Sequence, residues 1–190
     1  GGALDSWLEK NIGNLEQIQI LQILLEVSLG MVALSWHNIV HRDLAARNVL
    51  VGAGMHVKVS DYGLSREVGD RNYYKVQSRR PLPLRWTAPE ILVSLKCTQA
   101  TDVYAYGVLV SEVYCCGALP FDTLEDNDLL TFLVESHKPI SAYLDFKHMW
   151  ASAPGVEQSL QAPEPMRVLT TTCVSRDPAL RPTFAAVAES

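Results

Sequence analysis

The stretch His41–Asn48, which reads His-Arg-Asp-Leu-Ala-Ala-Arg-Asn, places a carboxylate, an amide and two guanidinium groups within one short segment. Two further motifs follow it along the chain, Asp61-Tyr62-Gly63 and Ala88-Pro89-Glu90. A tripeptide alone is weak evidence, but three motifs in this order and at these separations arise very rarely by chance. An interpretation as unrelated acidic loops with capping side chains is therefore poor, and we expect one site built around His41–Asn48.

Length and composition are those of an ordinary globular protein. The 190 residues make one domain, or most of one, with enough material for a core. The net charge of -5 is mild and the basic residues are scattered, so no nucleic-acid partner is indicated. The cysteines lack the spacing of metal ligands, and we expect buried, reduced thiols of a cytosolic protein at Cys97, Cys115, Cys116 and Cys173.

The most apolar stretch, Ile18–Leu34, is interrupted by Gln19, Gln22 and Glu26, which fall on one helical face. A membrane-spanning helix needs about 20 predominantly apolar residues, so we expect no membrane segment within this chain. A long amphipathic helix starting near Leu15 is predicted instead, because apolar residues step by three and four along one stripe: Ile18, Leu21, Leu25, Leu29 and Val32.

Short apolar runs after the first motif predict a β-hairpin. Val49–Val51 is expected to be one strand and Gly52–Gly54 the turn. The second strand is expected within His56–Ser60, because valines alternate there with polar residues. Such a hairpin would fix the separation between Asn48 and Asp61 without a flexible connection.

A second long helix is predicted farther along the chain. Thr101 is expected to be its N-cap, Asp102 its first residue and Gly117 its stop. The body from Val103 to Cys116 is apolar on nearly every face. Because a helix that is apolar all round is buried, we expect this one to run through the centre of the domain.

Taken together, the three motifs resemble the catalytic half of a protein kinase, whose signature is H-R-D with an Asn five residues after the Asp, then D-F-G, then A-P-E. Arg176–Phe184, Arg-Asp-Pro-Ala-Leu-Arg-Pro-Thr-Phe, resembles the end of such a domain. The resemblance implies a mainly α fold: a protein-kinase-like C-terminal lobe, helical with a short β-hairpin after the catalytic loop. It covers residues 1-190 as a partial domain, with an unusual insertion within about residues 134-160.

Several parts of a kinase domain do not occur in these 190 residues: a glycine-rich loop, a Val-Ala-x-Lys strand and the Glu that partners its Lys. In the family these parts belong to the amino-terminal lobe, which clamps the nucleotide. We therefore expect the chain to be a fragment of a longer kinase, inactive when it is expressed alone.

Two segments resemble kinases that act on tyrosine rather than on serine or threonine. Ala45 stands where Ser/Thr kinases typically have Lys, and the cation is instead Arg47. A tyrosine hydroxyl stands farther from its backbone than a serine hydroxyl does, so the substrate peptide needs a different support. The segment before Ala88 resembles that support, and the resemblance implies protein substrates with an acceptor tyrosine and a substrate platform of Pro83, Arg85 and Trp86.

The resemblance implies roles around the catalytic loop. Asp43 would accept or orient the proton of the tyrosine hydroxyl, and Arg47 would screen the γ-phosphate of ATP. Asn48 and Asp61 would hold Mg²⁺, with Mn²⁺ as an alternative ion. Leu50 would lie beneath the adenine ring. The implied cofactors are therefore ATP and magnesium.

Other residues would regulate this site. Arg42 would pair with a phosphorylated tyrosine of the activation segment, for which Tyr73 and Tyr74 are the candidates. The alternative for these two tyrosines is a pair of surface aromatics that pack on the lobe. Glu90 and Arg181 would form an ion pair that ties the activation segment to the end of the lobe.

Structural support is implied at three positions, which are His41, Tyr62 and Asp102. Asp102 matches the acidic residue that holds the backbone near His41 and the following arginine. Tyr62 stands where the family usually has Phe, and we expect its ring to be buried, with a hydrogen-bond partner for its hydroxyl.

Two functions are compatible with these motifs. The first is a protein-tyrosine kinase, and the alternative is a non-catalytic, pseudokinase-like regulatory or scaffolding module. The retention of Asp43, Asn48 and Asp61 together favours the enzyme, because a binding module does not need all three. Such a kinase would be cytoplasmic, or would form the cytoplasmic portion of a membrane receptor.

Overall fold

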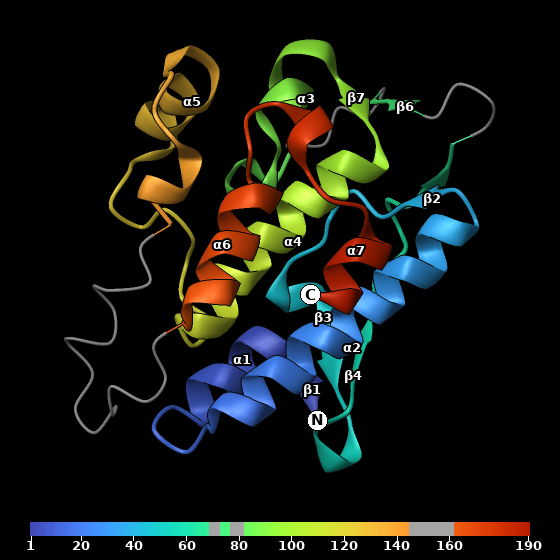
Figure 1. Ribbon diagram of the computed structural model, residues 1–190, viewed down its shortest axis with the longest axis vertical. Helices are drawn as coiled ribbons and strands as arrows, with labels where there is room; N and C mark the ends of the chain where they lie inside the picture. The colour runs from blue at the N-terminus through green and yellow to red at the C-terminus, as the bar shows by residue number, and fades with distance from the viewer. Residues whose placement is uncertain (69–72, 77–81, 145–161) are drawn as a thin grey trace.

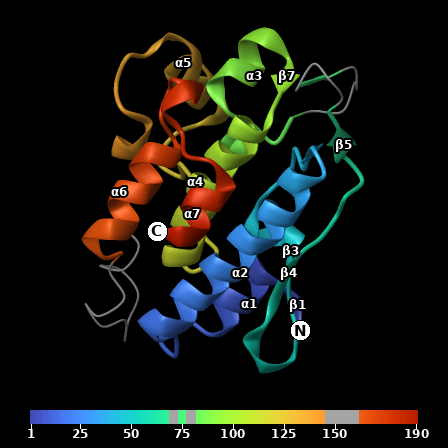
Figure 2. The ribbon, with the colours of Figure 1, turned by 45° about the vertical axis from the view of Figure 1, so that its right-hand side comes forward.

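The computed structural model describes residues 1–68, 73–76, 82–144 and 162–190. This part of the chain is mainly helical, and helix α4 (Gln99–Tyr114) runs through its middle (Figure 1). Helices α2 (Gln17–Trp36) and α6 (Glu164–Cys173) both pack against α4, as Figure 2 also shows. Shorter helices lie around this centre: α1 (Leu4–Lys10), α3 (Pro89–Ser94), α5 (Asp126–Glu135) and α7 (Phe184–Glu189).

The strands are short and pair antiparallel. One sheet has the order β1 (Gly2–Ala3), β3 (Val49–Val51) and β4 (Val57–Val59). Elsewhere β2 (Ile39–Val40) pairs with β5 (Arg66–Glu67), and β6 (Tyr74–Lys75) pairs with β7 (Lys96–Cys97). Single 3₁₀ turns are η1 (Ala46–Asn48), η2 (Ala53–Met55), η3 (Leu84–Trp86), η4 (Ile140–Ala142) and η6 (Pro178–Leu180).

The predicted hairpin is confirmed as β3 and β4. Leu50 lies opposite Lys58 in its register, and the turn passes through Gly54, whose φ is 68°. The third strand of this sheet, β1, was not predicted, because two residues carry no alternating pattern. The mainly helical kinase-like lobe with a short hairpin after the catalytic loop is thus the fold that the structure has.

Helix α4 begins three residues earlier than predicted, at Gln99 rather than at Asp102. Thr98 is its N-cap: the Thr98 hydroxyl accepts the N–H of Thr101 at 3.4 Å, and the Thr101 hydroxyl oxygen accepts the N–H of Thr98 at 3.0 Å. The prediction was wrong because Thr101 has the same capping chemistry but occupies the third helical position of a capping box. The prediction of a central helix is confirmed, since every residue from Thr101 to Tyr114 is buried.

Helix α2 forms where the spacing predicts it, but three of the five residues of the predicted apolar stripe are exposed, whereas Val32 packs against the core. Ile18, Leu25 and Leu29 are 66%, 46% and 51% exposed. The opposite side is also apolar and packs against α4, α7 and β4 with Ile20, Ile23, Leu24, Val27 and Met31. Because both sides of the helix are apolar, the spacing alone could not identify the buried one.

By length and composition α2 is able to cross a membrane, since an 18-residue window has a mean hydropathy of 1.8. Within this structure 39% of that window is buried. A core helix of a globular protein meets the same criteria, and the contacts of α2 with α4, α7 and β4 are those of a core helix. The expectation of no membrane segment within the chain stays a prediction.

Within the described residues, the core has two hydrophobic clusters on different sides of α4. Tyr106 and Leu109 belong to the cluster formed with α1, α2 and α7, and Tyr104 and Val108 belong to the cluster formed with α3 and α5. The cysteines at 97, 115, 116 and 173 are buried, as expected, and none is joined to another in a disulfide. The predicted insertion within 134-160 begins at the end of α5, and its part from residue 145 onward lies outside the described residues.

Candidate active site

The loop that follows β2 is attached to the central helix by Asp102. Its Oδ2 atom accepts the N–H of His41 at 2.7 Å, and its Oδ1 atom accepts the N–H of Arg42 at 3.0 Å. Burial raises the pKa of the Asp102 carboxyl to about 7, and the two backbone hydrogen bonds oppose this shift. These bonds fix a backbone in which Arg42 has a φ of 73°, a conformation that is uncommon for a residue with a side chain.

His41 is fully buried and connects the two ends of the site. Its Nε2 atom lies 3.0 Å from the carbonyl oxygen of Ser60, and its Nδ1 atom accepts the N–H of Asp43 at 3.3 Å. Burial lowers the pKa of the imidazole, while the Ser60 carbonyl and the charges of Asp43 and Asp61 oppose that effect. His41 therefore links the catalytic loop to the segment before Asp61.

Asp43, Arg47 and Asn48 are brought together by a single turn of the loop. Arg47 forms an ion pair with Asp43, and the side-chain amide nitrogen of Asn48 donates to the carbonyl oxygen of Asp43 at 2.7 Å. The carbonyl oxygen of Asn48 accepts both the N–H and the hydroxyl of Ser60, at 2.8 and 2.9 Å. The loop and the start of the Asp61 motif are thus held by direct hydrogen bonds.

The Asp61 motif differs in one respect from the expectation. Asp61 is exposed, has a φ of 58° and accepts the N–H of Gly63 at 3.2 Å. The Tyr62 ring is 52% exposed, so the prediction that it is buried was wrong. The ring has an edge contact with the ring of His41, at 5.7 Å between centroids. Its hydroxyl has the partner that was expected for it, because it donates to the carbonyl oxygen of Val59 at 3.0 Å.

The donor set fits a magnesium ion that is shared with a nucleotide. Magnesium prefers oxygen ligands, usually one or two from protein carboxylates together with phosphate and water. The Asn48 amide uses its nitrogen for Asp43, so its oxygen is the atom that would bind a cation, and the Asp61 carboxylate is exposed. Among the residues that the structure describes, no three His, Cys, Asp or Glu side chains gather as a closed metal site. Leu50, expected beneath adenine, is 48% exposed on β3.

The two candidate phosphorylation sites face different cations. The Tyr74 ring centre lies 4.3 Å from the guanidinium carbon of Arg42 and 5.9 Å from that of Arg66. The Tyr73 ring centre lies 4.7 Å from the ammonium nitrogen of Lys96. Both tyrosines are half-buried, and Tyr74 is held in the β6–β7 pair.

Glu90 and Arg181 form a bidentate ion pair, with nitrogen–oxygen distances of 2.6 and 2.9 Å. Arg181 also donates to the carbonyl oxygens of Ser175 at 2.8 Å and of Ala100 at 2.9 Å. Its side chain is 0% exposed. The pair therefore connects the start of α3 with the start of α4 and the segment after α6, as expected for these two residues.

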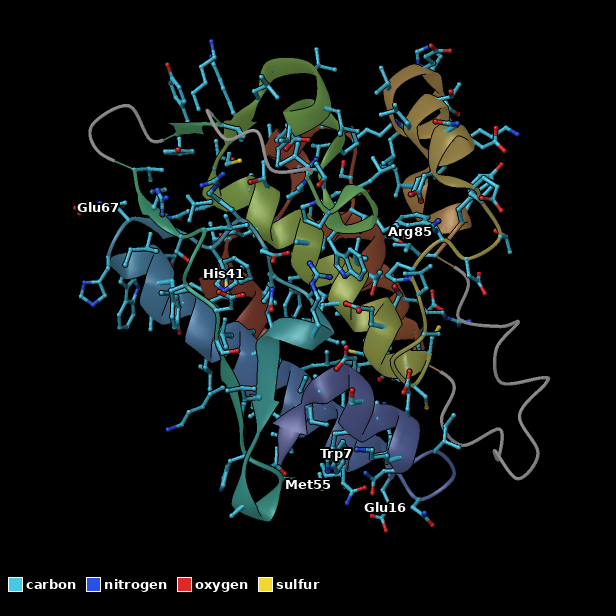
Figure 3. The ribbon with its side chains drawn as sticks, turned by 180° about the vertical axis from the view of Figure 1, so that it is seen from behind. Trp7, Glu16, His41, Met55, Glu67 and Arg85 are labelled. Atoms are coloured by element: carbon cyan, nitrogen blue, oxygen red, sulfur yellow. The ribbon has the colours of Figure 1, made fainter. Side chains whose placement is uncertain are left out.

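Two of the three residues of the expected platform, Pro83 and Trp86, line one pocket beside Asp43, whereas Arg85 does not. Trp86 faces the catalytic loop, and its ring centre lies 4.3 Å from the guanidinium carbon of Arg47. Pro83 lies at the start of η3, where its carbonyl oxygen accepts the hydroxyl of Thr87 at 2.9 Å. Arg85 turns instead toward α5, away from the labelled His41 (Figure 3), so its place in the platform is corrected.

The reason for the orientation of Arg85 is its set of acceptors. Its guanidinium donates to the carbonyl oxygens of Pro120, Phe121 and Leu124 at 2.7–3.0 Å and to the Asp126 carboxylate at 2.7 Å. A planar guanidinium with several donors is best satisfied by such converging oxygens. Arg85 therefore joins η3 to the segment between α4 and α5.

Two residues that contact this site were missed by the sequence analysis. Glu112, on α4, accepts the N–H of Ala46 at 3.0 Å and the indole N–H of Trp86 at 2.7 Å. The sequence did contain a signal for Glu112, because an acidic residue in a helix that is apolar on every face needs a buried partner. Arg66, the second cation beside Tyr74, was also missed and had no comparable signal.

Known proteins are similar to this chain over its whole length. The family model described as protein tyrosine and serine/threonine kinase matches residues 1–190. Ephrin type-B receptor 3 of Xenopus laevis is 35% identical over 193 aligned residues, which cover 100% of this chain and 18% of the receptor. The tyrosine-protein kinase transmembrane receptor Ror of Drosophila melanogaster is 43% identical over 129 residues, 68% of this chain and 19% of that protein. The chain spans about a fifth of the length of these relatives. With its catalytic loop, its Asp61 motif and its Glu90–Arg181 pair in one lobe, the chain belongs to the protein tyrosine and serine/threonine kinase family.

Proposed function

We propose that this chain carries the catalytic loop of a protein-tyrosine kinase, which transfers the γ-phosphate of ATP to tyrosine hydroxyls of protein substrates. The observation that carries the proposal is the position of Arg47, which pairs with Asp43 and stacks on Trp86. The cation of the loop thus stands four residues after Asp43, the arrangement that resembles tyrosine kinases. The Drosophila relative is described as a tyrosine-protein kinase, which supports the same specificity.

In the proposed reaction Asp43 orients the acceptor hydroxyl and takes its proton as the hydroxyl oxygen bonds to the γ-phosphorus of ATP. The bond from that phosphorus to the oxygen that bridges it to the β-phosphate breaks, and ADP leaves. The ion pair with Arg47 keeps this carboxylate in one orientation and brings a positive charge to where the transferred phosphoryl group would lie. Asn48 and Asp61 would supply oxygen atoms to a magnesium ion, whose charge would offset that of the phosphates. The other contribution of the protein is to position the reacting groups, because phosphoryl transfer requires little covalent chemistry from the protein.

Positioning begins with the backbone of the loop. Asp102 accepts two consecutive N–H groups, at His41 and Arg42, and the Asn48 side chain closes the turn on the Asp43 carbonyl oxygen. These bonds lie on both sides of the Asp43 carboxylate. They support its proposed role, because a group that orients a nucleophile must itself be held still.

The rest of the machinery is proposed to lie in a longer protein. An amino-terminal lobe would supply the glycine-rich loop and the lysine that clamp the α- and β-phosphates. The two relatives named above are receptors, and we propose that this chain acts in the cytoplasm, either in a soluble kinase or in the cytoplasmic portion of a receptor.

The test is a transfer assay with labelled ATP, comparing the 190-residue chain with the longer protein that carries it. Matched peptides that differ only in having tyrosine or serine at the acceptor position report the specificity. We expect the longer protein to label tyrosine at least tenfold faster than serine, and the chain alone to label neither. Labelling of serine at the same rate would contradict the tyrosine specificity. Nucleotide binding without transfer would favour the non-catalytic module instead.

A further inference from the structure

Glu112 carries a carboxylate that is buried in the last turn of α4, and it has no role in the reaction proposed above. It is 4% exposed, in a helix whose residues from Thr101 to Tyr114 are all buried. Burying an ionised carboxylate is costly unless hydrogen bonds and an opposite charge compensate it. The groups that contact Glu112 should therefore explain why an acid occupies this position.

The hydrogen bonds of Glu112 go to two segments of the candidate active site. A single oxygen atom, Oε2, accepts the backbone N–H of Ala46 at 3.0 Å and the indole N–H of Trp86 at 2.7 Å. Ala46 belongs to the catalytic loop, and Trp86 belongs to the platform segment. One atom of the central helix thus joins two segments that are far apart in the sequence.

The ring of Trp86 continues this connection to Asp43. Its face lies 4.3 Å from the guanidinium carbon of Arg47, and Arg47 pairs with Asp43. The contacts therefore run from Glu112 through Trp86 and Arg47 to Asp43. They return to Glu112 through the backbone of Ala46, which lies next to Arg47 in the same loop.

The charge of Glu112 acts on this chain of contacts in two ways. An indole N–H that donates to a carboxylate is polarised, which makes the ring face a better partner for a cation. The carboxylate also attracts the charge of Arg47 directly, and the acid Asp5 on α1 is the opposing charge nearby. A neutral amide would keep the hydrogen bonds but lose both effects.

We propose that Glu112 is a positioning residue for phosphoryl transfer: through the indole of Trp86 it sets the orientation in which Arg47 meets Asp43. This inference rests on the proposed function. It differs from a purely structural role, for which the volume of the side chain and its two hydrogen bonds would be sufficient. The distinction predicts that Gln at position 112 folds normally but transfers phosphate poorly.

The kinetic test is a double-mutant cycle in the longer protein, with a tyrosine peptide at pH 8. The variants are Glu112→Gln, Trp86→Phe and the pair. Gln keeps an oxygen acceptor of the same size, and Phe keeps a ring face without the N–H. We expect Glu112→Gln to lower kcat about tenfold with an unchanged KM for ATP. In the Trp86→Phe background the same change should have little further effect, because the connection is already broken.

Glu26→Gln is the matched control. Glu26 also accepts a backbone N–H, that of Val57 at 2.7 Å, but it lies on α2 and faces the hairpin. The control should leave kcat unchanged. If Glu112→Gln lowered kcat equally in the parent and in the Trp86→Phe background, Glu112 would act by another route and the proposal would be overturned. A Glu112→Gln protein with the parent kcat would overturn it as well.

A second readout does not depend on activity. With ¹⁵N-labelled tryptophan, the indole N–H signal of Trp86, identified by its loss in Trp86→Phe, should move in Glu112→Gln and stay in place in Glu26→Gln. An unmoved signal would by itself overturn the proposal. If the parent protein transferred no phosphate to tyrosine, the proposed function would fail. A moved signal in that case would support the contact between Glu112 and Trp86 and reject its role in transfer.

Discussion

The guanidinium of Arg42 stacks on the ring of Tyr74, with 4.3 Å between the guanidinium carbon and the ring centre. Arg66 lies on the same ring at 5.9 Å, whereas the ring of Tyr73 lies at 4.7 Å from Lys96. The adjacent tyrosines therefore have different environments. A phosphate on Tyr74 would meet two arginines, one of them in the catalytic loop, and arginines bind phosphate more specifically than a lysine does.

We predict that phosphorylation of Tyr74 activates the longer protein and that phosphorylation of Tyr73 contributes less. Tyr74→Phe should remove most of the rise in kcat that follows incubation with ATP, because the Arg42 contact with phosphate cannot form. Tyr73→Phe is the matched control and should keep most of that rise. Mass spectrometry of each variant, alongside peptide kinetics, checks the assignment. Activation lost in Tyr73→Phe but kept in Tyr74→Phe would reverse it.

The ion pair of Glu90 and Arg181 should be important for stability. Arg181 is 0% exposed and Glu90 is 25% exposed, so Arg181→Leu leaves a largely buried carboxylate without its partner. Breaking such a pair costs about 3 kcal/mol. Arg167→Leu is the control, because Arg167 and Glu164 form an exposed pair, 46% and 69%, which contributes at most about 0.5 kcal/mol. Urea denaturation measures both, and equal losses in the two variants would contradict the prediction.

The catalytic loop and the hairpin could be predicted because their functions constrain the residue types. A loop with Asp43, Arg47 and Asn48 at fixed spacing requires one local backbone, and the valines of β3 and β4 then have only one way to pair. The central helix was predictable for a simpler reason. A segment that is apolar on every face has no stable position except the core.

The remaining features of the fold and the site depend on contacts that leave no pattern in the sequence. Arg85 was expected in the platform, but its acceptors are backbone carbonyl oxygens of a loop, and any residue type could supply them. On α2 both sides are apolar, so the choice of the buried side came from the shape of the neighbouring elements. Tyr62 was expected to be buried because the family has Phe there, although its hydroxyl already favours the surface.

The stability of the domain should depend on pH through Glu112. Burial raises the pKa of its carboxyl to about 7, against the hydrogen bonds from Trp86 and Ala46 and the charge of Arg47, while Asp5 adds to the rise. A folded-state pKa above the unfolded value means that the contribution of this group is fully present below the unfolded pKa, and is lost as the pH rises through about 7.

Glu112→Gln removes this titration. The difference in unfolding free energy between the parent and the variant should therefore shift by on the order of 2 kcal/mol between pH 5 and pH 8, in favour of the variant at pH 8. Urea denaturation at the two pH values measures the shift. Taking the difference cancels the titration of His41 and Asp102, which both proteins share. A constant difference would show that Glu112 has an ordinary pKa.

Two carboxylates of the site should respond differently to the same substitution. Asp43→Asn in the longer protein should lower kcat for a tyrosine peptide by a factor of about 100 or more with little change in affinity for ATP, because it removes the group that orients the hydroxyl. Asp61→Asn should instead weaken binding of the magnesium–ATP complex. Steady-state kinetics with separate titrations of ATP and magnesium distinguish the two. Parent-like turnover of Asp43→Asn would exclude Asp43 from the reaction.

Helices α4 and α6 approach each other closely at Gly107, where α4 meets the end of α6. A methyl group built at Gly107 would lie 2.8 Å from the Cβ atom of Cys173 and 2.8 Å from a methyl carbon of Val174. Both distances are shorter than carbon atoms tolerate, and the Cβ atom of Cys173 cannot move without its helix. Gly107 is therefore required by packing rather than by backbone conformation.

Gly107→Ala should consequently destabilise the domain by about 1–3 kcal/mol, the usual cost of overpacking a core, although Ala favours a helix by about 1 kcal/mol over Gly. Gly30→Ala on α2 is the matched control, since a methyl group there would meet the side chain of Val59, with its nearest methyl carbon at 3.2 Å and its Cβ atom at 3.8 Å. That contact can relax by a small shift of the valine, and the control should lie within about 1 kcal/mol of the parent. Urea denaturation of the two variants measures the contrast. If Gly107→Ala were as stable as Gly30→Ala, α4 and α6 would have to be less closely packed at this point than the structure has them.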